Sequence, residues 1–256
     1  MRSIIPSLLL ACIALVPALA QKTVSAQEII EKINRKEAVL YQNVTVTGDL
    51  DLTNLANRHE VREGGWRGES EQYLSTVEVP LTFRDCTFKG KVLAYWSEDL
   101  NRMKTSSKVY NADFKEAVTI ENCVFEDDAA FKYSKFDQRA VFTGNTFREE
   151  ALFKYTKFRN AADFSQSSFR GYADFKYTHF DEASAFQKAT FERSADFKYT
   201  KFEEGVDFRQ VRFAGNADFK YTNFPRGTNF DDVTFNGSSD FKYAKLDGRR
   251  FSPDGR

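Results

Sequence analysis

One eight-residue segment recurs six times in this chain at a constant interval. Its form at 195–202 is ADFKYTKF, and each copy begins 22 residues after the one before it. Phe, Lys and Tyr therefore return at one fixed phase. A constant period of this length indicates a repeat architecture, in which each unit packs against its neighbours. The six copies begin at Ala129, Ala151, Ala173, Ala195, Ala217 and Ser239.

Large apolar residues, most of them Phe, are spaced alternately by six and five residues from Phe125 to Leu246. A helix needs a spacing near 3.6 residues and a regular strand needs a longer alternating run, so neither fits. Short strands of the form small–polar–Phe do fit, because the first and third residues point to the same side. Four such strands make 22 residues. The chain is therefore predicted to turn a corner after each strand and to return above its start.

The repeated unit resembles that of the pentapeptide-repeat family, A-(D/N)-L-x-x with Leu or Phe at the centre. The segments ADFKY at 195–199 and ADFSQ at 162–166 match it directly. The resemblance covers about 44–251 and is most regular from Ala112. It implies an all-β fold, a right-handed parallel quadrilateral β-helix or β-solenoid. The chain departs from the family pattern in its 22-residue coil and its nearly constant Phe, which predict a slightly wider coil.

The segment before the coils predicts a short capping α-helix. Ser25 and Glu28 form a capping box, and the apolar residues that follow recur on one helix face. An apolar face at the start of a solenoid is expected to cover its open end. The residues of this face are Ile29, Ile30, Ile33 and Val39.

The predicted organisation after the N-terminus has three parts. The capping segment is 21–43, the solenoid is 44–251, and the tail is 252–256. Two loops, near 57–76 and 95–108, interrupt the solenoid, because the early coils repeat with an offset of 37 residues, one coil plus a 15-residue insertion. No helix is predicted after the last coil. Because an uncapped edge invites strand pairing, this end allows a homodimer through the C-terminal coil, as the resemblance also implies.

Residues 1–20 have the pattern of a signal peptide. Arg2 precedes an apolar segment from Ile4 to Val16, and Ala18-Leu19-Ala20 is a cleavage motif that would leave Gln21 as the first mature residue. An uncleaved membrane anchor and a lipoprotein signal at Cys12 are the alternatives. No later stretch is long and apolar enough to span a bilayer. The protein is therefore expected to be exported, to the periplasm or the extracellular space.

Cys86 and Cys123 are the only cysteines of the predicted mature chain, and each stands two residues before a Phe. The predicted register places them on the same face of adjacent coils. That separation suits a disulfide, and an exported protein meets an oxidising compartment. The alternative is that Cys serves as a small apolar core residue. The two histidines, His59 and His179, are far apart in register, so no metal site is predicted.

The repeat predicts outward columns of Lys and Tyr, with a column of Asp beside them. One interpretation is a flat amphipathic stripe for a polymer, with Tyr faces for sugar rings and Lys and Asp for hydroxyls or carboxylates. The alternative is that Asp offsets Lys repulsion and stacked Tyr adds stability, and the repetition favours this alternative. The column residues proposed for a ligand or partner surface are Tyr155, Tyr177, Tyr199, Tyr221, Lys154, Lys176, Lys198 and Lys220.

The two interruptions are the other candidate surface. Loops escape the packing constraint of a solenoid and often carry its binding site. The alternative is that each Trp folds back over the shaft and that the charges only solvate a loop. The residues proposed here for a ligand or partner surface are Trp66, Arg67, Tyr95, Trp96 and Arg102.

The sequence favours an exported, non-catalytic scaffold or binding module of the cell envelope. It has no nucleophile elbow, P-loop, zinc-protease or dinucleotide motif, so no catalytic residue and no cofactor are predicted. The expected partner is an unknown protein or a cell-envelope polysaccharide, and not a nucleic acid.

Two other functions are weighed against this one. A carbohydrate-active β-helix enzyme of the polysaccharide lyase type would require a unique acidic or Arg/Lys cluster on one face. The DNA-mimic role of some pentapeptide-repeat proteins, which shield topoisomerases, requires a cytoplasmic and strongly acidic rod. The chain instead carries 37 basic and 37 acidic residues, which opposes the DNA-mimic role and a polyanion binder driven by bulk charge.

Overall fold

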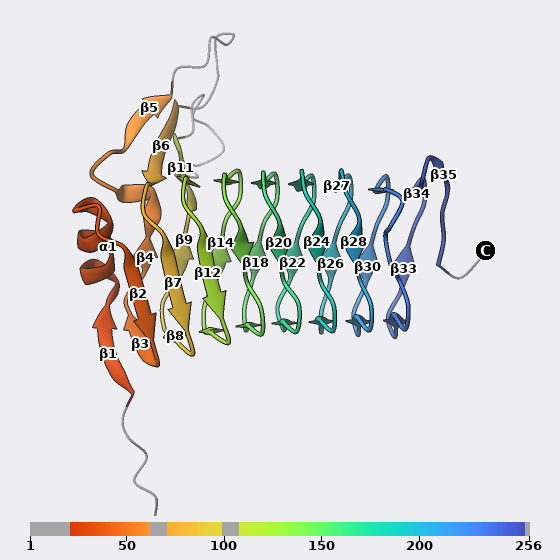
Figure 1. Ribbon diagram of the computed structural model, residues 1–256, viewed down its shortest axis with the longest axis horizontal. Coiled ribbons are helices and arrows are strands. Elements are labelled where there is room, and N and C mark those ends of the chain that lie inside the picture. Colours follow the sequence, from red (N-terminus) through yellow and green to blue (C-terminus); the bar gives the residue numbers. More distant parts are fainter. Residues whose placement is uncertain (1–20, 62–70, 99–107, 254–256) are drawn as a thin grey trace, which may run out of the picture.

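The structure is a computed structural model that describes residues 21–61, 71–98 and 108–253. Within these ranges the chain forms a four-sided solenoid of stacked short strands, with one short α-helix at its N-terminal end (Figure 1). The all-β quadrilateral architecture predicted from the repeat is confirmed. The predicted signal peptide, 1–20, lies outside the described residues.

Each side of the solenoid is one sheet, and neighbouring coils pair in parallel along it. Sheet A contains β1 (Lys22–Ser25), β3 (Val44–Thr47), β8 (Thr87–Phe88), β13 (Val124–Phe125), β17 (Thr146–Phe147), β21 (Ser168–Phe169), β25 (Thr190–Phe191), β29 (Arg212–Phe213) and β32 (Thr234–Phe235). Sheet B contains β2 (Val39–Gln42), β7 (Leu81–Arg84), β12 (Val118–Glu121), β16 (Ala140–Val141), β20 (Ala162–Asp163), β24 (Ser184–Ala185) and β28 (Val206–Asp207).

The other two sides meet at the corner that concerns the candidate site. Sheet C contains β4 (Leu50–Asp51), β9 (Val92–Leu93), β14 (Ala129–Ala130), β18 (Ala151–Leu152), β22 (Ala173–Asp174), β26 (Ala195–Asp196), β30 (Ala217–Asp218) and β33 (Ser239–Asp240). Sheet D contains β5 (His59–Val61), β6 (Glu71–Val77), β10 (Tyr95–Glu98), β11 (Lys108–Phe114), β15 (Lys135–Phe136), β19 (Lys157–Phe158), β23 (His179–Phe180), β27 (Lys201–Phe202), β31 (Asn223–Phe224), β34 (Lys245–Leu246) and β35 (Arg249–Arg250).

The strand register includes both intervals found in the sequence and a third that the sequence analysis did not identify, an offset of 42 residues that pairs Val39 with Leu81 and Leu50 with Val92. In the regular coils each residue pairs with the residue 22 positions on, as Ala173 does with Ala195. Between the first two complete coils the offset is 37, so that Val77 pairs with Phe114 and Phe88 with Phe125. One regular coil passes through sheets C, D, B and A in that order. The 15-residue excess is therefore an insertion into one coil, as predicted.

The core consists of four columns of Phe. Along a column the rings stack almost parallel, and Phe164 lies 5.1 Å from Phe186 with an angle of 9° between the rings. Across columns the rings meet edge to face, and Phe164 lies 5.3 Å from Phe175 at 85°. Both arrangements are favourable for aromatic pairs. A two-residue strand has little stability of its own, so this packing and the hydrogen bonds between coils hold each coil in place.

Each residue of the FKYT segment has a separate structural role, which the coil of Phe175 illustrates. Phe175 enters the core, whereas Lys176 and Tyr177 lie outside the corner between sheets C and D. Thr178 turns inward, is fully buried, and donates through Oγ1 to the carbonyl oxygen of Phe153 one coil earlier at 2.7 Å. The hydroxyl thus binds the preceding coil, which explains why Thr or Ser recurs here.

The cap at the N-terminal end confirms the predicted helix and corrects one residue. In α1 (Ala26–Asn34), Ser25 accepts a hydrogen bond from the N–H of Glu28 at 3.1 Å. The sequence analysis placed Val39 on this helix, but in the structure Val39 lies in β2. The reason is that the helix ends at Asn34 and Lys36 then takes a left-handed conformation, φ 57°, which turns the chain into sheet B. The isoleucines facing the core are Ile29, Ile30 and Ile33.

At the C-terminal end the chain folds back on the last coil. β35 pairs antiparallel with β34, and the Phe251 ring packs against Phe230 and Phe241 at 5.1 and 5.8 Å. The edge of sheet D is therefore covered by β35, whereas β32, β28 and β33 end the other three sheets among the described residues. A homodimer through this coil stays a prediction.

Replacing Phe164 tests the stacked core. Phe164→Ala removes a fully buried ring and is expected to destabilise the protein by about 3–5 kcal/mol, as measured by urea unfolding followed by circular dichroism. Phe164→Leu keeps most of the volume and should lose clearly less. The exposed Glu182→Ala in the next coil is the control and should stay within about 0.5 kcal/mol of the parent. Equal losses in both Phe164 variants would contradict the stacked core.

Candidate functional site

Both interruptions of the repeat leave the shaft at the same corner, between sheets C and D. After β4 the chain continues through η1 (Leu52–Asn54), β5 and β6 before it joins sheet D, and after β9 it continues through β10 and β11. In the later coils this corner is closed by the FKYT turn. The insertions thus replace one turn in two successive coils, which brings them together in space.

The insertions form a single sheet, named here the extension sheet, from β5, β10 and the first halves of β6 and β11. β6 and β11 pair in parallel from Glu71 and Lys108 onward, while β5 and β10 pair antiparallel on their outer sides. Figure 1 shows this sheet rising from the first coils, to one side of the shaft. The sequence did not predict this pairing.

One face of the extension sheet is aromatic. The rings of Tyr73 and Tyr110 stack at 5.1 Å, and Trp96 lies 5.2 Å from Tyr110 on the opposite side. The guanidinium carbon of Arg58 lies 5.4 Å from the centre of the Tyr110 ring, a cation–π distance. Trp96 remains 44% exposed. This aromatic face therefore offers a solvent-accessible indole, Trp96, and a cation, Arg58, which both contact the Tyr110 ring.

A column of tyrosine rings begins at the base of this sheet. Tyr95, in β10, lies 5.6 Å from Tyr133, and the column continues one ring per coil to Tyr243, with centroids 4.7–5.0 Å apart. The corner tyrosines have left-handed backbones, φ 57–63°, a conformation that disfavours bulky residues. Because neighbouring rings cover each other's faces, the column offers ring edges and hydroxyls to a ligand rather than the sugar-stacking faces considered from the sequence.

A hollow of about 360 Å³ lies where the extension sheet meets the first two coils of this column. Its lining includes Asn111, Asp113, Tyr133, Lys135 and Tyr155. Asp113 is 7% exposed and accepts a hydrogen bond from the N–H of Lys135 at 2.9 Å. Burial raises the pKa of its carboxyl group. The Oδ1 of Asn111 is buried without a hydrogen-bond partner among the described residues.

The structure brings some of the proposed site residues together and leaves others apart. Tyr95 and Trp96 lie on the extension sheet, and Tyr155 lies beside it. The remaining proposed column residues run away from it along the corner. Trp66, Arg67 and Arg102 lie outside the described residues.

Sequence reasoning missed the pair Tyr73 and Tyr110. Their 37-residue separation equals the offset that relates Phe88 to Phe125, so that interval could have revealed them.

The two thiols predicted to form a disulfide are neighbours on adjacent coils. Both are buried and unbonded in this structure, and the N–H of Cys86 donates to Sγ of Cys123 at 3.3 Å. A side-chain hydrogen bond between them lowers the pKa of Cys86 to about 7 and raises the pKa of Cys123. The disulfide itself stays a prediction.

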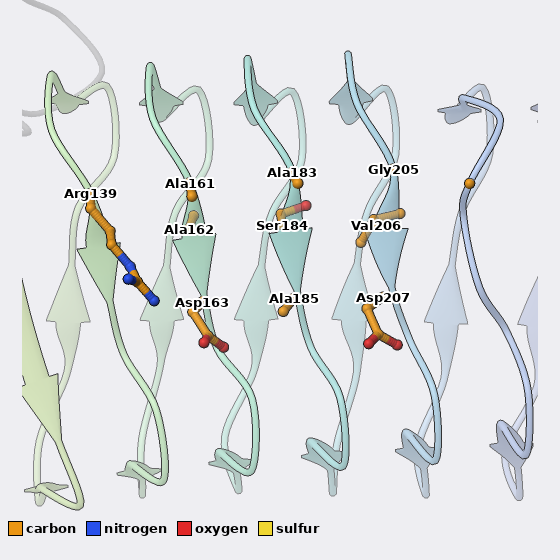
Figure 2. Close-up of a pocket in the computed structure, with 11 residues that line it drawn as sticks. Arg139, Ala161, Ala162, Asp163, Ala183, Ser184, Ala185, Gly205, Val206 and Asp207 are labelled. Carbon is orange, nitrogen blue, oxygen red and sulfur yellow. The ribbon is translucent and has the colours of Figure 1, made fainter.

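A second hollow, of about 400 Å³, lies on sheet B (Figure 2). Its floor consists of small residues such as Ala162 and Ala185, and Arg139, Asp163 and Asp207 lie along it. Asp207 is already held by Arg209 at 2.7 Å. Small side chains at successive corners account for this hollow, and no constellation of reactive groups gathers there.

The described ranges contain no group of three or more His, Cys, Asp or Glu placed to hold a metal ion. Neither α1 nor η1 has the length and apolarity of a membrane span.

Comparison with known proteins characterises the shaft. A family model described as pentapeptide repeats in nine copies matches residues 153–201, 175–223 and 197–245, successive matches being one coil apart. No curated protein matches the chain. All three matched segments begin beyond the extension sheet, so the family match describes the regular coils only.

A double-mutant cycle tests the aromatic face. In a Trp66→Phe background, Trp96→Ala and Tyr110→Ala should show a coupling energy of about 0.5–1.5 kcal/mol in urea unfolding, the usual contribution of an aromatic pair. Tyr110→Ala should also make Trp96 emission more easily quenched by acrylamide. Tyr221→Ala, on the far column, is the control and should not couple to Trp96. A coupling of zero would contradict the contact.

Proposed function

The chain belongs to the pentapeptide-repeat family through its regular coils, and on that premise we propose that it is an exported, non-catalytic binding module of the cell envelope. The shaft is the scaffold, and the extension sheet is the binding platform. The partner that fits this platform best is a cell-envelope polysaccharide, because indole, tyrosine hydroxyls and amide oxygens are groups that contact sugar rings and hydroxyls.

The observation that carries the proposal is the meeting of both insertions at one corner. The later coils close the same corner with a four-residue turn, so the shaft does not need the extra residues. The insertions nevertheless build an ordered sheet with Trp96, Tyr110 and Tyr73 in contact. Trp and Tyr are enriched in binding sites, since they combine apolar area with a polar group. A partner is the simplest reason for this surface.

The surface supports binding better than catalysis. Glu71 accepts a hydrogen bond from Tyr73 at 3.1 Å and pairs with Lys108 at 3.5 Å, so its charge is already compensated. Asp113 is held by Lys135. The groups around the hollow are thus donors and acceptors in fixed positions rather than an acid facing a base across a substrate-sized gap.

A fluorescence titration tests the proposal. Mature protein, residues 21–256 with Trp66→Phe, keeps Trp96 as its only indole. Peptidoglycan fragments and neutral and acidic polysaccharides should include a ligand that shifts Trp96 emission saturably, and Tyr110→Ala should weaken that binding. Tyr221→Ala is the matched control. A flat response to the whole panel, checked by calorimetry, would overturn the proposed function.

Export predicts the state of the cysteines. Protein recovered from the cell envelope should begin at Gln21 and carry a Cys86–Cys123 bond, seen by mass spectrometry of its peptides. Closing this loop should stabilise the fold by about 2–4 kcal/mol relative to the reduced form, as measured by urea unfolding with and without reductant. The Cys86→Ser, Cys123→Ser variant is the control and should not respond to reductant. Two free thiols in the exported protein would contradict this prediction.

A further inference from the structure

The lysine column at the corner between sheets C and D is not uniform along its length. In its C-terminal half Lys198 and Lys220 are neutralised, whereas Lys242, the last lysine, forms no ion pair among the described residues and lies 5.1 Å from the centre of the Tyr243 ring. Lys198 pairs with Asp196 at 3.0 Å and with Asp218 at 3.4 Å, and Lys220 pairs with Asp218 at 3.1 Å and with Asp240 at 3.2 Å. Lysine and aspartate therefore alternate there as a closed ladder of ion pairs.

The N-terminal half of the column lacks that ladder. Lys132, Lys154 and Lys176 form no ion pair with any carboxylate in the part of the chain that the structure describes. The sequence gives the reason for Lys132, because Ala130 and Leu152 occupy both positions that hold its Asp partners in later coils, and Lys154 lacks one of its two partners, at Leu152.

One carboxylate does face these lysines. Asp174 lies in the next coil and is 8% exposed. It accepts a hydrogen bond from the N–H of Lys176 at 3.1 Å. Its charge influences Lys132 and Lys154 only through space. Three ammonium groups therefore share one buried carboxylate, and the patch keeps a net positive charge.

Tyrosine rings position these ammonium groups without neutralising them. The Nζ of Lys132 lies 4.3 Å from the centre of the Tyr95 ring. Lys154 and Lys176 lie over their own coil's tyrosines, Tyr155 and Tyr177, at 5.3 and 5.5 Å. A cation–π contact fixes the position of a cation and leaves its charge available. The three charges thus line up one coil apart, about 4.8 Å, from the base of the extension sheet.

We propose that the polysaccharide bound by this protein is acidic, and that its anionic groups bind the patch formed by Lys132, Lys154 and Lys176. This inference rests on the proposed function and names the class of its ligand. A linear glycan with one carboxylate or sulfate per unit presents anions at short, regular intervals, as the patch presents cations. Its hydroxyls can reach the edges of the tyrosine rings.

Two features favour an acidic glycan over a nucleic acid. Single-stranded nucleic acids bind by stacking bases on open aromatic faces, and the rings of the tyrosine column cover one another. Duplex binding draws on many phosphate contacts over a basic surface, whereas this patch holds three charges beside a neutralised ladder.

The test uses polygalacturonate as the acidic probe and dextran as the neutral one, with isothermal titration calorimetry of the mature protein as the readout. The Lys132→Gln, Lys154→Gln, Lys176→Gln variant is expected to bind polygalacturonate about tenfold more weakly, which is about 1.4 kcal/mol. The matched control, Lys220→Gln, Asp240→Asn, removes one ion pair of the same column without changing the net charge and should bind as the parent does. Because the contacts are exposed, affinity should fall with added NaCl.

A second variant keeps all three lysines and removes only their net charge. Ala130→Asp, Leu152→Asp restores the acidic column of the later coils and should weaken polygalacturonate binding as the glutamine variant does. Circular dichroism and urea unfolding report whether each variant folds.

The outcomes separate this inference from the proposed function. Saturable binding of dextran as tight as that of polygalacturonate, or no loss in the glutamine variant, would overturn the acidic ligand and leave the binding module standing. Equal loss in the matched control would overturn the location of the patch. Oligothymidylate bound as tightly as polygalacturonate would overturn the ligand class. If none of these probes binds, the acidic ligand is overturned, and the proposed function fails as well if the whole panel of peptidoglycan fragments and polysaccharides gives no response.

Discussion

The hydrogen bonds between one coil and the next are the interaction on which the rest of the structure depends. A strand of two residues, such as β22, forms no stable structure alone, and its backbone groups find partners only in the coils before and after it. The N–H of Phe175, for example, donates to the carbonyl of Asp196 at 2.8 Å. This pairing aligns equivalent residues, and the alignment in turn produces the Phe columns, the buried threonine hydroxyls and the tyrosine column. Cooperation between neighbours replaces the single central core of an ordinary domain.

The sequence predicted the shaft closely because its physical constraint is local and repeated. Phe spacing determines the coil, and the offset of 37 residues places the early coils in register. The helix cap was also predictable from Ser25 and the isoleucines. The extension sheet was not, because nothing within either insertion shows that both begin at the same corner. That requires knowing which side of the solenoid each interrupts, and hence the complete coil.

Some residues of the candidate surface could be predicted from the sequence and others could not. Trp96 and Tyr95 were singled out because they break the repeat, and both lie on β10, where Trp96 contacts Tyr110 and Tyr95 contacts Tyr133. Tyr110 and Tyr73 were missed because aromatic residues within an insertion have no visible partner until the strands are paired. A related effect appears at Ser134, whose buried hydroxyl lacks a partner among the described residues. In later coils the equivalent hydroxyl donates to the carbonyl oxygen of a Phe in the preceding coil. The coil that precedes Ser134 has no such Phe, because its chain leaves the corner here to form β10 and β11. Departures from the repeat therefore mark the boundary of the extension.

The uniform coils beyond Lys176 have a consequence for how such a chain can change over time. Each coil pairs with the coil before it and the coil after it through equivalent residues. The gain or loss of one 22-residue segment would therefore leave the pairing between the remaining coils unchanged. The rod would lengthen or shorten in whole steps of about 4.8 Å, while the surface at its N-terminal end kept its shape. The number of coils thus determines the distance between the two ends of the solenoid, independently of what either end binds.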